Sequence, residues 1–365
     1  MHKVQLNYSL ARDNDANLIR NPLLDLLQAV AAGGSISAAA RALSLSYRHV
    51  WGELKRWEQE LGHELIVWEK GQSARLTEFG AKLLWAERQA QARLAPQIES
   101  LRADLERVFA VAFDDGAHVL GLYASHDDGL AALRGYAAQH ARLHLDIRFT
   151  GSVDAISALN EGRCEMAGFH TLEQPGPGTL AARTYKPLLE PGLHKIIGYA
   201  RRTQGLMTAP ANPHGIASLA DLARPGVRFV NRDLGTGTRV LLDEMLAQQG
   251  LPGDRIAGYQ RTEPSHAAVA QAVASGQADA GLGTEAAAVA RGLHFVPLVQ
   301  ERYHLVCLKS MLEQPATQAL TRLLRSPAWQ QQLARVAGYA PAQCGEVLSL
   351  SKLLPWWDFR PKKRP

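Results

Sequence analysis

The sequence is poor in cysteine. Only Cys164, Cys307 and Cys344 occur among 365 residues, and they lie far apart. This spacing excludes a disulfide framework and a zinc knuckle built from neighbouring cysteines. Two of the three lie inside apolar, strand-like runs, so we expect buried and inert thiols.

Long apolar runs are also absent. No stretch approaches the roughly 18 apolar residues of a transmembrane helix. The opening MHKVQLNYSLARDND lacks the apolar centre of a signal peptide. The hydrophobic share is 46% and the charged share 21%, as in a soluble globular protein. We therefore expect a cytoplasmic chain without a membrane partner, long enough for two or three domains.

A large excess of one charge is missing too. The net charge is +5, and the last ten residues, WWDFRPKKRP, supply +3 of it through four basic residues against one acidic residue. Any basic surface must therefore come from local arrangement. We expect residues 351–365 to be a solvated basic tail, for which nonspecific phosphate contacts are an alternative role.

Motifs of common enzymes do not occur. There is no P-loop or nucleophile elbow, and the GTGT of NRDLGTGTR lacks the glycine pattern and partner acid of a dinucleotide site. Ser125, His266 and Asp127 show no spacing that would support a catalytic triad. His126, His170 and His266 lack close metal-ligand spacing. We therefore expect no catalytic residue, no metal, no cofactor and no enzyme activity.

The sequence does contain a pattern of three short helices near its start. Leucines and a valine recur at helical spacing over residues 22–32, and two glycines follow. Ser35 or Ser37 is placed to cap a second short helix, and Ser46 to cap a third over residues 47–61. Two short helices joined by a tight turn are typical of a helix-turn-helix.

The third helix has two chemically different faces. Val50, Leu54, Trp57 and Leu61 are spaced to face a core, while the opposite side carries donors for phosphates and base edges. Segments 65–68 and 74–76 then predict a β-wing. We expect a winged helix-turn-helix in residues 1–88, although look-alikes occur in other helical domains. The expected DNA-binding residues are Ser35, Ser37, Ser46, Tyr47, Arg48, Trp51, Lys55, Lys70 and Arg75.

The run GSISAAARALSLSYRHVWGEL, the wing and RLTEFGAKLL together carry a family resemblance. They resemble the N-terminal domain of the molybdate-responsive ModE regulators and, more distantly, that of LysR-type regulators. The resemblance covers about residues 20–88. It implies a DNA-binding transcription regulator.

A helix with an apolar seam follows in residues 89–114. Leu94, Ile98, Leu101, Leu105 and Val108 alternate at spacings of four and three, which is an a/d pattern. We expect a dimerisation helix, or a higher homo-oligomer, and therefore a near-palindromic operator. The alternative is a helix that lies on its own domain. A proline at position 96 is expected to kink or split it.

The larger part of the chain alternates strands and helices from residue 116 onward, which predicts a parallel α/β architecture. VDAISALNEGRCEMAG and AAVAQAVASGQADAGL echo each other, so we expect two similar lobes with a cleft between them. Lobe I comprises residues 117–198 and 295–350 and lobe II residues 199–292, within a ligand-binding domain 115–350. The fold class is α+β multidomain, with a two-lobed α/β domain after the winged helix-turn-helix; the resemblance given below implies that this domain is periplasmic-binding-protein-like, of type II.

Polar residues gather where strands end and helices begin, which is where ligands bind in open α/β sheets. Hydroxyls at helix N-termini suit an anion, although each taken alone is more often only an N-cap. The expected ligand-binding residues are Ser125, His126, Asp127, Thr150, Ser152, His170, Asn231, Arg232, Gly237, Thr238, Arg239 and His266.

A second resemblance supports this domain. ASHDDGLAAL, NRDLGTGTRVLLDEML and SHAAVAQAVASGQADAGLG resemble the periplasmic-binding-protein-like domain that is fused to ModE-type DNA-binding domains or to molybdopterin-biosynthesis proteins. SHDDGL and NRDLGTGT also look like ligand loops of tungstate-binding proteins, which hold an oxyanion. By that resemblance the ligand positions are Ser125, His126, Asn231, Arg232, Gly237, Thr238 and Arg239. The Ser-His pair departs from the threonine- and serine-rich pattern of those binders.

These observations together predict a dimeric regulator that senses a small anion between its lobes. Molybdate or tungstate is the first expectation for the effector. An organic anion or a molybdenum-cofactor-related metabolite is the alternative, because histidines and acids accompany the donors. An enzyme of cofactor biosynthesis is a third and weaker interpretation.

Overall fold

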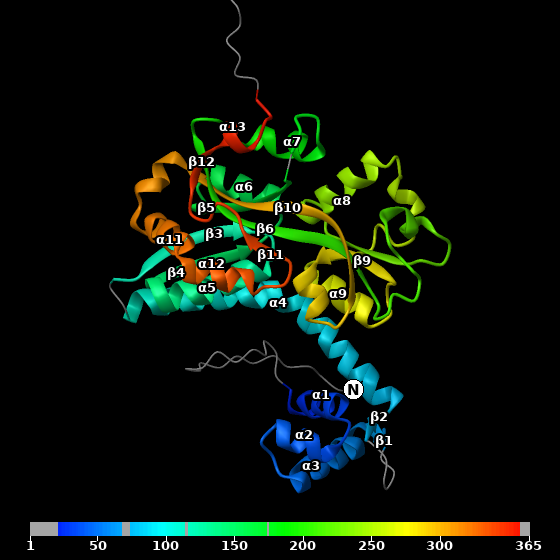
Figure 1. Cartoon of the computed structure of the whole chain (residues 1–365). Coiled ribbons are helices and arrows are strands. Elements are labelled where there is room, and N and C mark those ends of the chain that lie inside the picture. Colours follow the sequence, from blue (N-terminus) through cyan, green and yellow to red (C-terminus); the bar gives the residue numbers. More distant parts are fainter. Residues whose placement is uncertain (1–20, 68–73, 114–115, 174, 358–365) are drawn as a thin grey trace, which may run out of the picture. The chain divides into compact units, whose positions relative to one another are not determined.

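The computed structural model describes residues 21–67, 74–113, 116–173 and 175–357 (Figure 1). The chain divides into two compact units, Met1–Ala95 and Pro96–Pro365. Lys70 of the predicted wing and residues 358–365 of the predicted basic tail lie outside the described residues. The prediction of a solvated tail is wrong for residues 351–357, because Leu354 and Trp356 are buried in an apolar core. No single described helix is long and apolar enough to cross a membrane, although one bent pair, Pro22–Gly33 with Ile36–Ala42, meets the criterion by length and composition.

The first unit is a helix-turn-helix followed by a small wing. Its elements are α1 (Pro22–Gly33), α2 (Ile36–Ala42), α3 (Tyr47–Leu61), β1 (Ile66–Val67), β2 (Arg75–Leu76) and the start of α4 (Glu78–Phe113). Side chains of Asn21, Ser35 and Ser46 cap the first three helices. The two wing strands pair antiparallel. The predicted winged helix-turn-helix is confirmed, and of the two candidate serines Ser35 is the cap.

A buried carboxylate that the spacing did not reveal connects α3 to the wing. Glu58 Oε1 accepts hydrogen bonds from the backbone N–H groups of Leu65 at 2.8 Å and Ile66 at 3.3 Å. Its Oε2 pairs with Lys55 Nζ at 2.6 Å. Burial by itself would raise the pKa of Glu58, but the bonds from Lys55 and the two amides lower it overall. Glu58 is therefore ionised and fixes the first wing strand against α3.

The helix α4 is continuous through Pro96. Of the two predicted effects of Pro96, a kink or a split, the split does not occur. The division between the two units falls at this residue. The hydroxyl of Ser100 donates to the Pro96 carbonyl at 2.9 Å, so that carbonyl keeps a partner.

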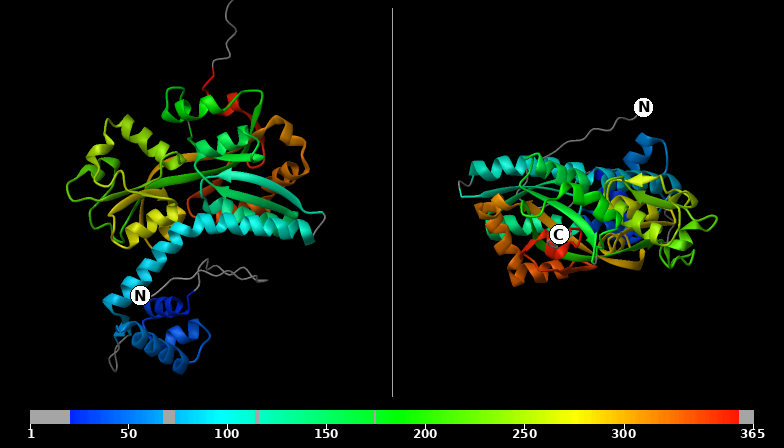
Figure 2. Two further views of the ribbon diagram at one scale, coloured as in Figure 1. Left: turned by 180° about the vertical axis from the view of Figure 1, so that it is seen from behind. Right: turned by 90° about the horizontal axis from the view of Figure 1, so that it is seen from above.

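The second unit is built on one ten-stranded sheet (Figures 1 and 2). The strands, in spatial order, are β4 (Leu143–Phe149), β3 (His118–Ala124), β5 (Met166–Leu172), β10 (His294–Leu308), β6 (His194–Thr208), β9 (Ala280–Thr284), β7 (Phe229–Arg232) and β8 (Thr262–Glu263). Two short strands, β11 (Tyr339–Pro341) and β12 (Val347–Ser349), pair with β6.

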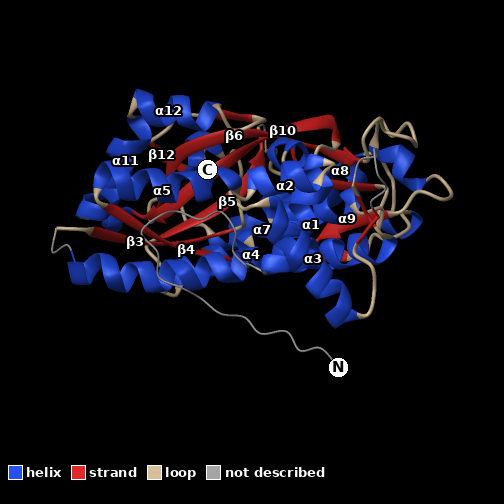
Figure 3. Cartoon of the chain, turned by 90° about the horizontal axis from the view of Figure 1, so that it is seen from below, coloured by secondary structure: helices blue, strands red, loops and turns tan. Residues whose placement is uncertain are grey.

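Helices cover both faces of this sheet, as the colouring by secondary structure shows (Figure 3). They are α5 (Asp128–Ala141), α6 (Ser152–Asn160), α7 (Leu180–Tyr185), α8 (Gly237–Gln248), α9 (His266–Ala274), α10 (Glu285–Val289), α11 (Pro315–Arg325), α12 (Pro327–Ala334) and α13 (Leu350–Leu353). Short 3₁₀ helices lie at Lys186–Leu188, Leu219–Ala223, Gly253–Arg255 and Lys309–Glu313. Separate apolar cores form on the two faces in each half of the unit.

Two long strands join the halves. β6 and β10 pair antiparallel along their whole length, from His194↔Leu308 to Thr208↔His294. The pairing shifts register between Pro297 and Val299 and again between Tyr303 and His304. The predicted lobe boundary after residue 198 falls inside β6, because both lobes share this strand. The pairing of the two shared strands is therefore irregular at two positions along its length.

Candidate functional site

The exposed face of α3 carries the predicted DNA contacts. Tyr47 and Arg48 are exposed at its N-terminus, and Ser37 on α2 and Arg75 on β2 are exposed as well. The hydroxyls of Ser35 and Ser46 accept the capping N–H bonds of α2 and α3. The ammonium group of Lys55 already has partners within α3, because it pairs with Glu58 and lies 4.9 Å from the centroid of the Trp51 ring. Tyr47 and Arg48 are thus the donors of α3 most available to DNA.

A buried polar centre lies where β6 and β10 cross between the lobes. Arg202 of β6 and Glu301 of β10 are register partners, and the Arg202 guanidinium forms ion pairs with both Glu301 and Asp127. Its Nη2 lies 3.1 Å from His170 Nδ1, and the hydroxyl of Tyr339 donates to Asp127 at 2.5 Å. Asp127 also caps α5 through the N–H of Leu130. The Arg202 guanidinium is therefore surrounded by Asp127, His170 and Glu301.

The electrostatics of this cluster follow from its burial. Burial opposes the charge of Arg202, but Glu301 and Asp127 raise its pKa well above the ordinary value. Burial raises the pKa of Glu301, and Arg202 partly offsets that rise. Burial together with the arginines holds the pKa of His170 and His266 well below the ordinary value. Both imidazoles are therefore neutral near pH 7.

The lobe II side of the centre contains a second buried arginine. Arg232 ends β7 with 1% exposure, and its Nη1 donates to the Glu263 carbonyl at 3.0 Å. Its Nε has no hydrogen-bond partner among the described residues, and no described carboxylate forms an ion pair with it. Burial lowers its pKa to about 10, a shift that Asp233 opposes and Arg202 reinforces. Arg232 is therefore a buried cation that has no ion-pair partner among the described residues, and the charge of Asp233 compensates it only in part.

Gln204 connects the two sides. Its amide nitrogen donates to Glu301 Oε1 at 2.9 Å and to the Thr238 hydroxyl at 3.2 Å. The Thr238 hydroxyl lies 3.4 Å from His266 Nε2. This series of contacts runs from β6 and β10 to the N-termini of α8 and α9.

Hydroxyl groups gather at the N-terminus of α6. The Ser125 and Ser152 oxygens are 3.4 Å apart and both residues are buried. Tyr185 is fully buried beside Ser152, and burial raises its pKa. No side chain caps α6. Three hydroxyls and the free N–H groups of α6 are therefore donors in one place.

Three predicted ligand residues are engaged elsewhere. The Arg239 guanidinium pairs with Asp243 at 3.0 Å and stacks over the Tyr259 ring at 4.2 Å, so it does not offer an uncompensated charge. The Asn231 amide donates to the Tyr259 carbonyl at 3.1 Å. Thr150 is only half-buried and bonds Asp154 at 3.5 Å.

His126 links the polar centre to α4. Its Nε2 lies 3.7 Å from Glu99 Oε1, and the Glu99 carbonyl accepts from Arg134 Nη1 at 3.2 Å. Phe149 donates its backbone N–H to the Ser100 hydroxyl at 3.3 Å. This part of α4 lies on its own unit, as the alternative interpretation expected. Most of its seam is nevertheless exposed: Leu94 (37%), Leu101 (60%), Leu105 (39%) and Val108 (59%).

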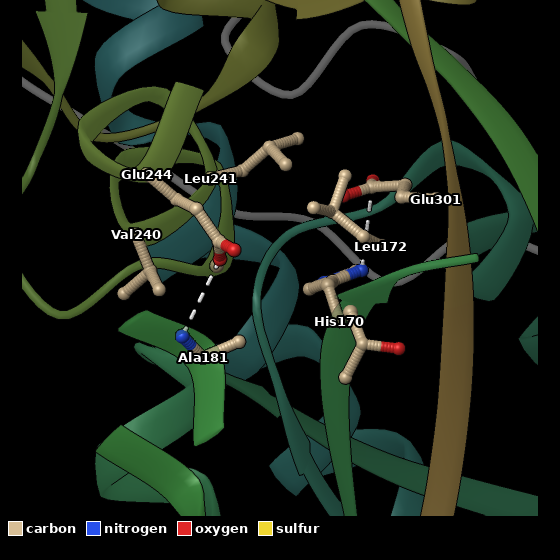
Figure 4. A pocket seen from close by; sticks show the side chains of 9 residues that line it. His170, Leu172, Ala181, Val240, Leu241, Glu244 and Glu301 are labelled. Atoms are coloured by element: carbon tan, nitrogen blue, oxygen red, sulfur yellow. Dashed lines mark hydrogen bonds and ion pairs between the residues drawn. The ribbon is translucent and has the colours of Figure 1, made fainter. Parts of the chain in front are cut away.

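A small cavity lies at the edge of the polar centre, between the lobes (Figure 4). His170, Gly237, Glu244 and Glu301 are among the residues that line it. A Cβ atom on Gly237 would come within 2.6 Å of His170 Cδ2, so this glycine permits the close approach of α8. The cavity of about 10 Å³ holds roughly one water molecule. A larger ligand therefore requires the lobes to separate.

Sequence reasoning missed several residues of this centre, namely Arg202, Gln204, Glu301, Tyr185 and Tyr339. Arg202 lies beside Arg201 and Thr203, and Glu301 lies between Gln300 and Arg302, so neither residue interrupts an apolar run and no local signal marked them as buried. Among the described residues, no group of three or more His, Cys, Asp or Glu side chains could hold a metal ion.

Comparison with known proteins matches both units. A family model described as a PBP superfamily domain matches residues 133–325. A model described as bacterial regulatory helix-turn-helix protein, lysR family, matches residues 22–81. The latter family is regulatory and not enzymatic, in agreement with the expectation that the chain is not an enzyme.

Two curated relatives are uncharacterized. Protein YvgK of Bacillus subtilis (strain 168) is 32% identical over 201 residues, which are 55% of this chain and 64% of that protein. The chain thus spans less than two thirds of that relative. A protein in the 5′ region of a 2Fe-2S ferredoxin gene of Clostridium pasteurianum is 33% identical over 111 residues, which are 30% of this chain and 98% of that protein.

Solved structures with a similar fold include full-length CbnR with its target DNA, at 16% identity and a TM-score of 0.41, covering 81% of this chain and 95% of that one. ArgP from Mycobacterium tuberculosis is 21% identical with a TM-score of 0.38, covering 83% and 95%. With a lysR-family helix-turn-helix before its larger domain, the chain belongs to the PBP superfamily and has the domain composition of a ligand-responsive LysR-type transcription regulator.

Proposed function

We propose that this chain regulates transcription in response to a small anion that binds at the polar centre between the lobes. The observation that carries the proposal is Arg232, a guanidinium with 1% exposure, an unpartnered Nε and no carboxylate paired with it. A buried charge is costly unless it is compensated. An anion at this position supplies the missing countercharge.

Neutral donors support the same ligand class. Ser125, Ser152 and Tyr185 bring hydroxyls to the uncapped N-terminus of α6. The N-termini of α8 and α9 face the centre through Thr238 and His266. Helix N-termini and hydroxyls together bind oxyanions without requiring further charge.

Two kinds of anion fit this proposal. Molybdate or tungstate is the candidate that the family resemblance implies. An organic anion or a molybdenum-cofactor-related metabolite is the second candidate. A specific observation favours the second: Glu301 is a buried acceptor at the same centre, and one of its oxygens has no partner.

The effector is proposed to act through α4. Binding that moves the loop of Asp127 also moves His126, which contacts Glu99 on that helix. The effector shifts DNA affinity only as far as it prefers one arrangement of the lobes over the other.

The proposal is tested by the substitution Arg232→Ala. Isothermal titration with molybdate, tungstate and sulfate establishes which oxyanion the wild type binds. Affinity for the bound anion is expected to fall by about 10- to 100-fold in the variant, because a charged hydrogen bond is lost. DNA binding and folding should persist, since the removed charge has no ion-pair partner.

Arg228→Ala is the matched control. Arg228 directly precedes the same strand, β7, but it pairs with Asp279 at the surface. Unchanged anion affinity in Arg232→Ala would reject this assignment of the site. No heat with any of the three oxyanions in the wild type would exclude them as effectors and leave the organic anion.

We also propose that the exposed seam of α4 pairs with the same seam in a second copy of the chain, so that two recognition helices meet a near-palindromic operator. Leu101→Asp is expected to raise the dimer dissociation constant at least about tenfold, because it buries a charge in an apolar interface. Light scattering after size exclusion measures this. Leu101→Met should remain dimeric, and a dimeric Leu101→Asp variant would contradict the proposal.

A further inference from the structure

Only one oxygen of the Glu301 carboxylate accepts hydrogen bonds from the described residues. Its Oε1 accepts from Arg202 Nε and from Gln204 Nε2. Its Oε2 has no hydrogen-bond partner in the described part of the chain, although the residue is 1% exposed. Glu301 lines the interlobe cavity together with His170 and the N-terminal Gly237 of α8 (Figure 4). A buried, unpartnered acceptor thus borders the place where the lobes meet.

The other carboxylate of the cavity differs in this respect. Glu244 of α8 lies across from Glu301 in Figure 4. Its Oε2 accepts from the Ala181 N–H at 3.4 Å, and its Oε1 accepts from Gln248 Nε2 at 3.4 Å. Of the two acids that line the cavity, Glu301 alone has an oxygen without a partner.

The described groups around Glu301 donate no hydrogen bond to its Oε2. Arg202 and Gln204 bind Oε1, and neutral His170 lies 3.7 Å from the same oxygen. Asp127, across Arg202, adds negative charge. The hydroxyls of Tyr185 and Tyr303 are close enough for Glu301 to raise their pKa, but within the described part of the chain neither hydroxyl forms a hydrogen bond with Glu301.

A carboxylate oxygen accepts hydrogen bonds and repels another deprotonated oxygen. A bound anion that places an O–H or N–H against Oε2 satisfies it, whereas a fully deprotonated oxyanion leaves it unpaired or requires Glu301 to take up a proton. Sites built around a buried polar group reject ligands that cannot pair with it.

We propose that Glu301 is a specificity-determining residue, which makes the site select anions that carry a hydrogen-bond donor of their own over fully deprotonated oxyanions. This inference rests on the proposed anion site. It favours hydrogen phosphates, hydroxy acids and related organic anions as the ligand class.

Inorganic phosphate and sulfate are the probes, because they share a tetrahedral shape and near pH 7 only phosphate carries a proton. Isothermal titration of the full chain is expected to give at least tenfold tighter binding of phosphate than of sulfate. Molybdate follows sulfate in having no proton. Sulfate or molybdate that does bind is expected to take up about one proton, measured as a dependence of the heat on buffer ionisation enthalpy.

Glu301→Gln keeps an oxygen for Arg202 and Gln204 and places an amide donor at the free position. The preference for phosphate over sulfate is expected to fall at least tenfold in this variant. Glu244→Gln is the matched control from the same cavity and should leave the preference unchanged. The proton-uptake measurement on the wild type decides the question independently if Glu301→Gln fails to fold.

Equal binding of sulfate and phosphate by the wild type, without proton uptake, would overturn the role of Glu301. So would equal changes in both glutamine variants. Absence of binding by every anion tried, hydroxy acids included, would instead overturn the anion site itself and this inference with it.

Discussion

Replacing Arg202 with alanine is expected to lower the free energy of unfolding of the second unit by about 3–5 kcal/mol. The guanidinium is 1% exposed and pairs with Asp127 and Glu301, which are equally buried. Its removal leaves two carboxylates in the interior without a cation. Breaking a buried pair in this way costs far more than the net stability that the intact pair provides, because the desolvated partners remain.

The decrease in the free energy of unfolding caused by Arg202→Ala should depend on pH. The pKa of Glu301 is raised in the folded chain, so its protonated form is favoured there and the unfolded chain gives up the proton first. The stabilisation that Glu301 contributes is therefore complete below its ordinary pKa, and it is lost as pH rises through the raised pKa of the folded chain. Arg202 restrains that rise, so its removal extends the loss to higher pH.

Urea unfolding at pH 5 and pH 8 measures both effects, and the penalty of Arg202→Ala should be smaller at pH 5. Arg201→Ala is the matched control, because Arg201 is the next residue on β6 but pairs with Glu173 at the surface. Such exposed pairs contribute about 0–1 kcal/mol. A comparable loss in both variants, or one independent of pH, would contradict the buried-cluster interpretation.

The helical parts of the DNA-binding unit could be predicted because their signals are local. Ser46 lies three residues before the N–H that it accepts, and the apolar side chains of α3 repeat at helical spacing. The wing followed from a short turn-prone segment between two extended ones. Glu58 escaped the same reasoning, because its partners Leu65 and Ile66 become neighbours only after the chain turns back.

The centre of the larger domain was harder to predict for the same physical reason. Arg202 and Glu301 are 99 positions apart and meet only because β6 and β10 pair along their whole length. Within one strand, a single charged residue is as compatible with a solvent-facing position as with a buried pair. Arg239 shows how a local signal can be incomplete: its place at a helix N-terminus suggested an anion contact, and the structure adds that Asp243, one turn later, pairs with it.

Replacing Arg48 with alanine is expected to weaken specific operator binding strongly while the fold remains intact. Arg48 is exposed at the N-terminal end of α3, which is the end that contacts base edges in a helix-turn-helix. A lost bidentate contact costs about 1–3 kcal/mol. In a dimer the loss occurs twice and amounts to roughly 30-fold or more in affinity. The operator is first selected from random duplex DNA with the wild type, and the variant is then compared by gel-shift titration.

Arg56→Ala provides the matched control, because Arg56 is an exposed arginine of the same helix that pairs with Glu53 at 2.6 Å. The kind of loss in Arg48→Ala is as informative as its size. If operator and unrelated DNA weaken equally and the salt dependence becomes shallower, Arg48 contacts phosphate. If only operator binding weakens, Arg48 reads bases. Unchanged binding would remove α3 as the recognition helix, because Tyr47 and Arg48 are its most available donors.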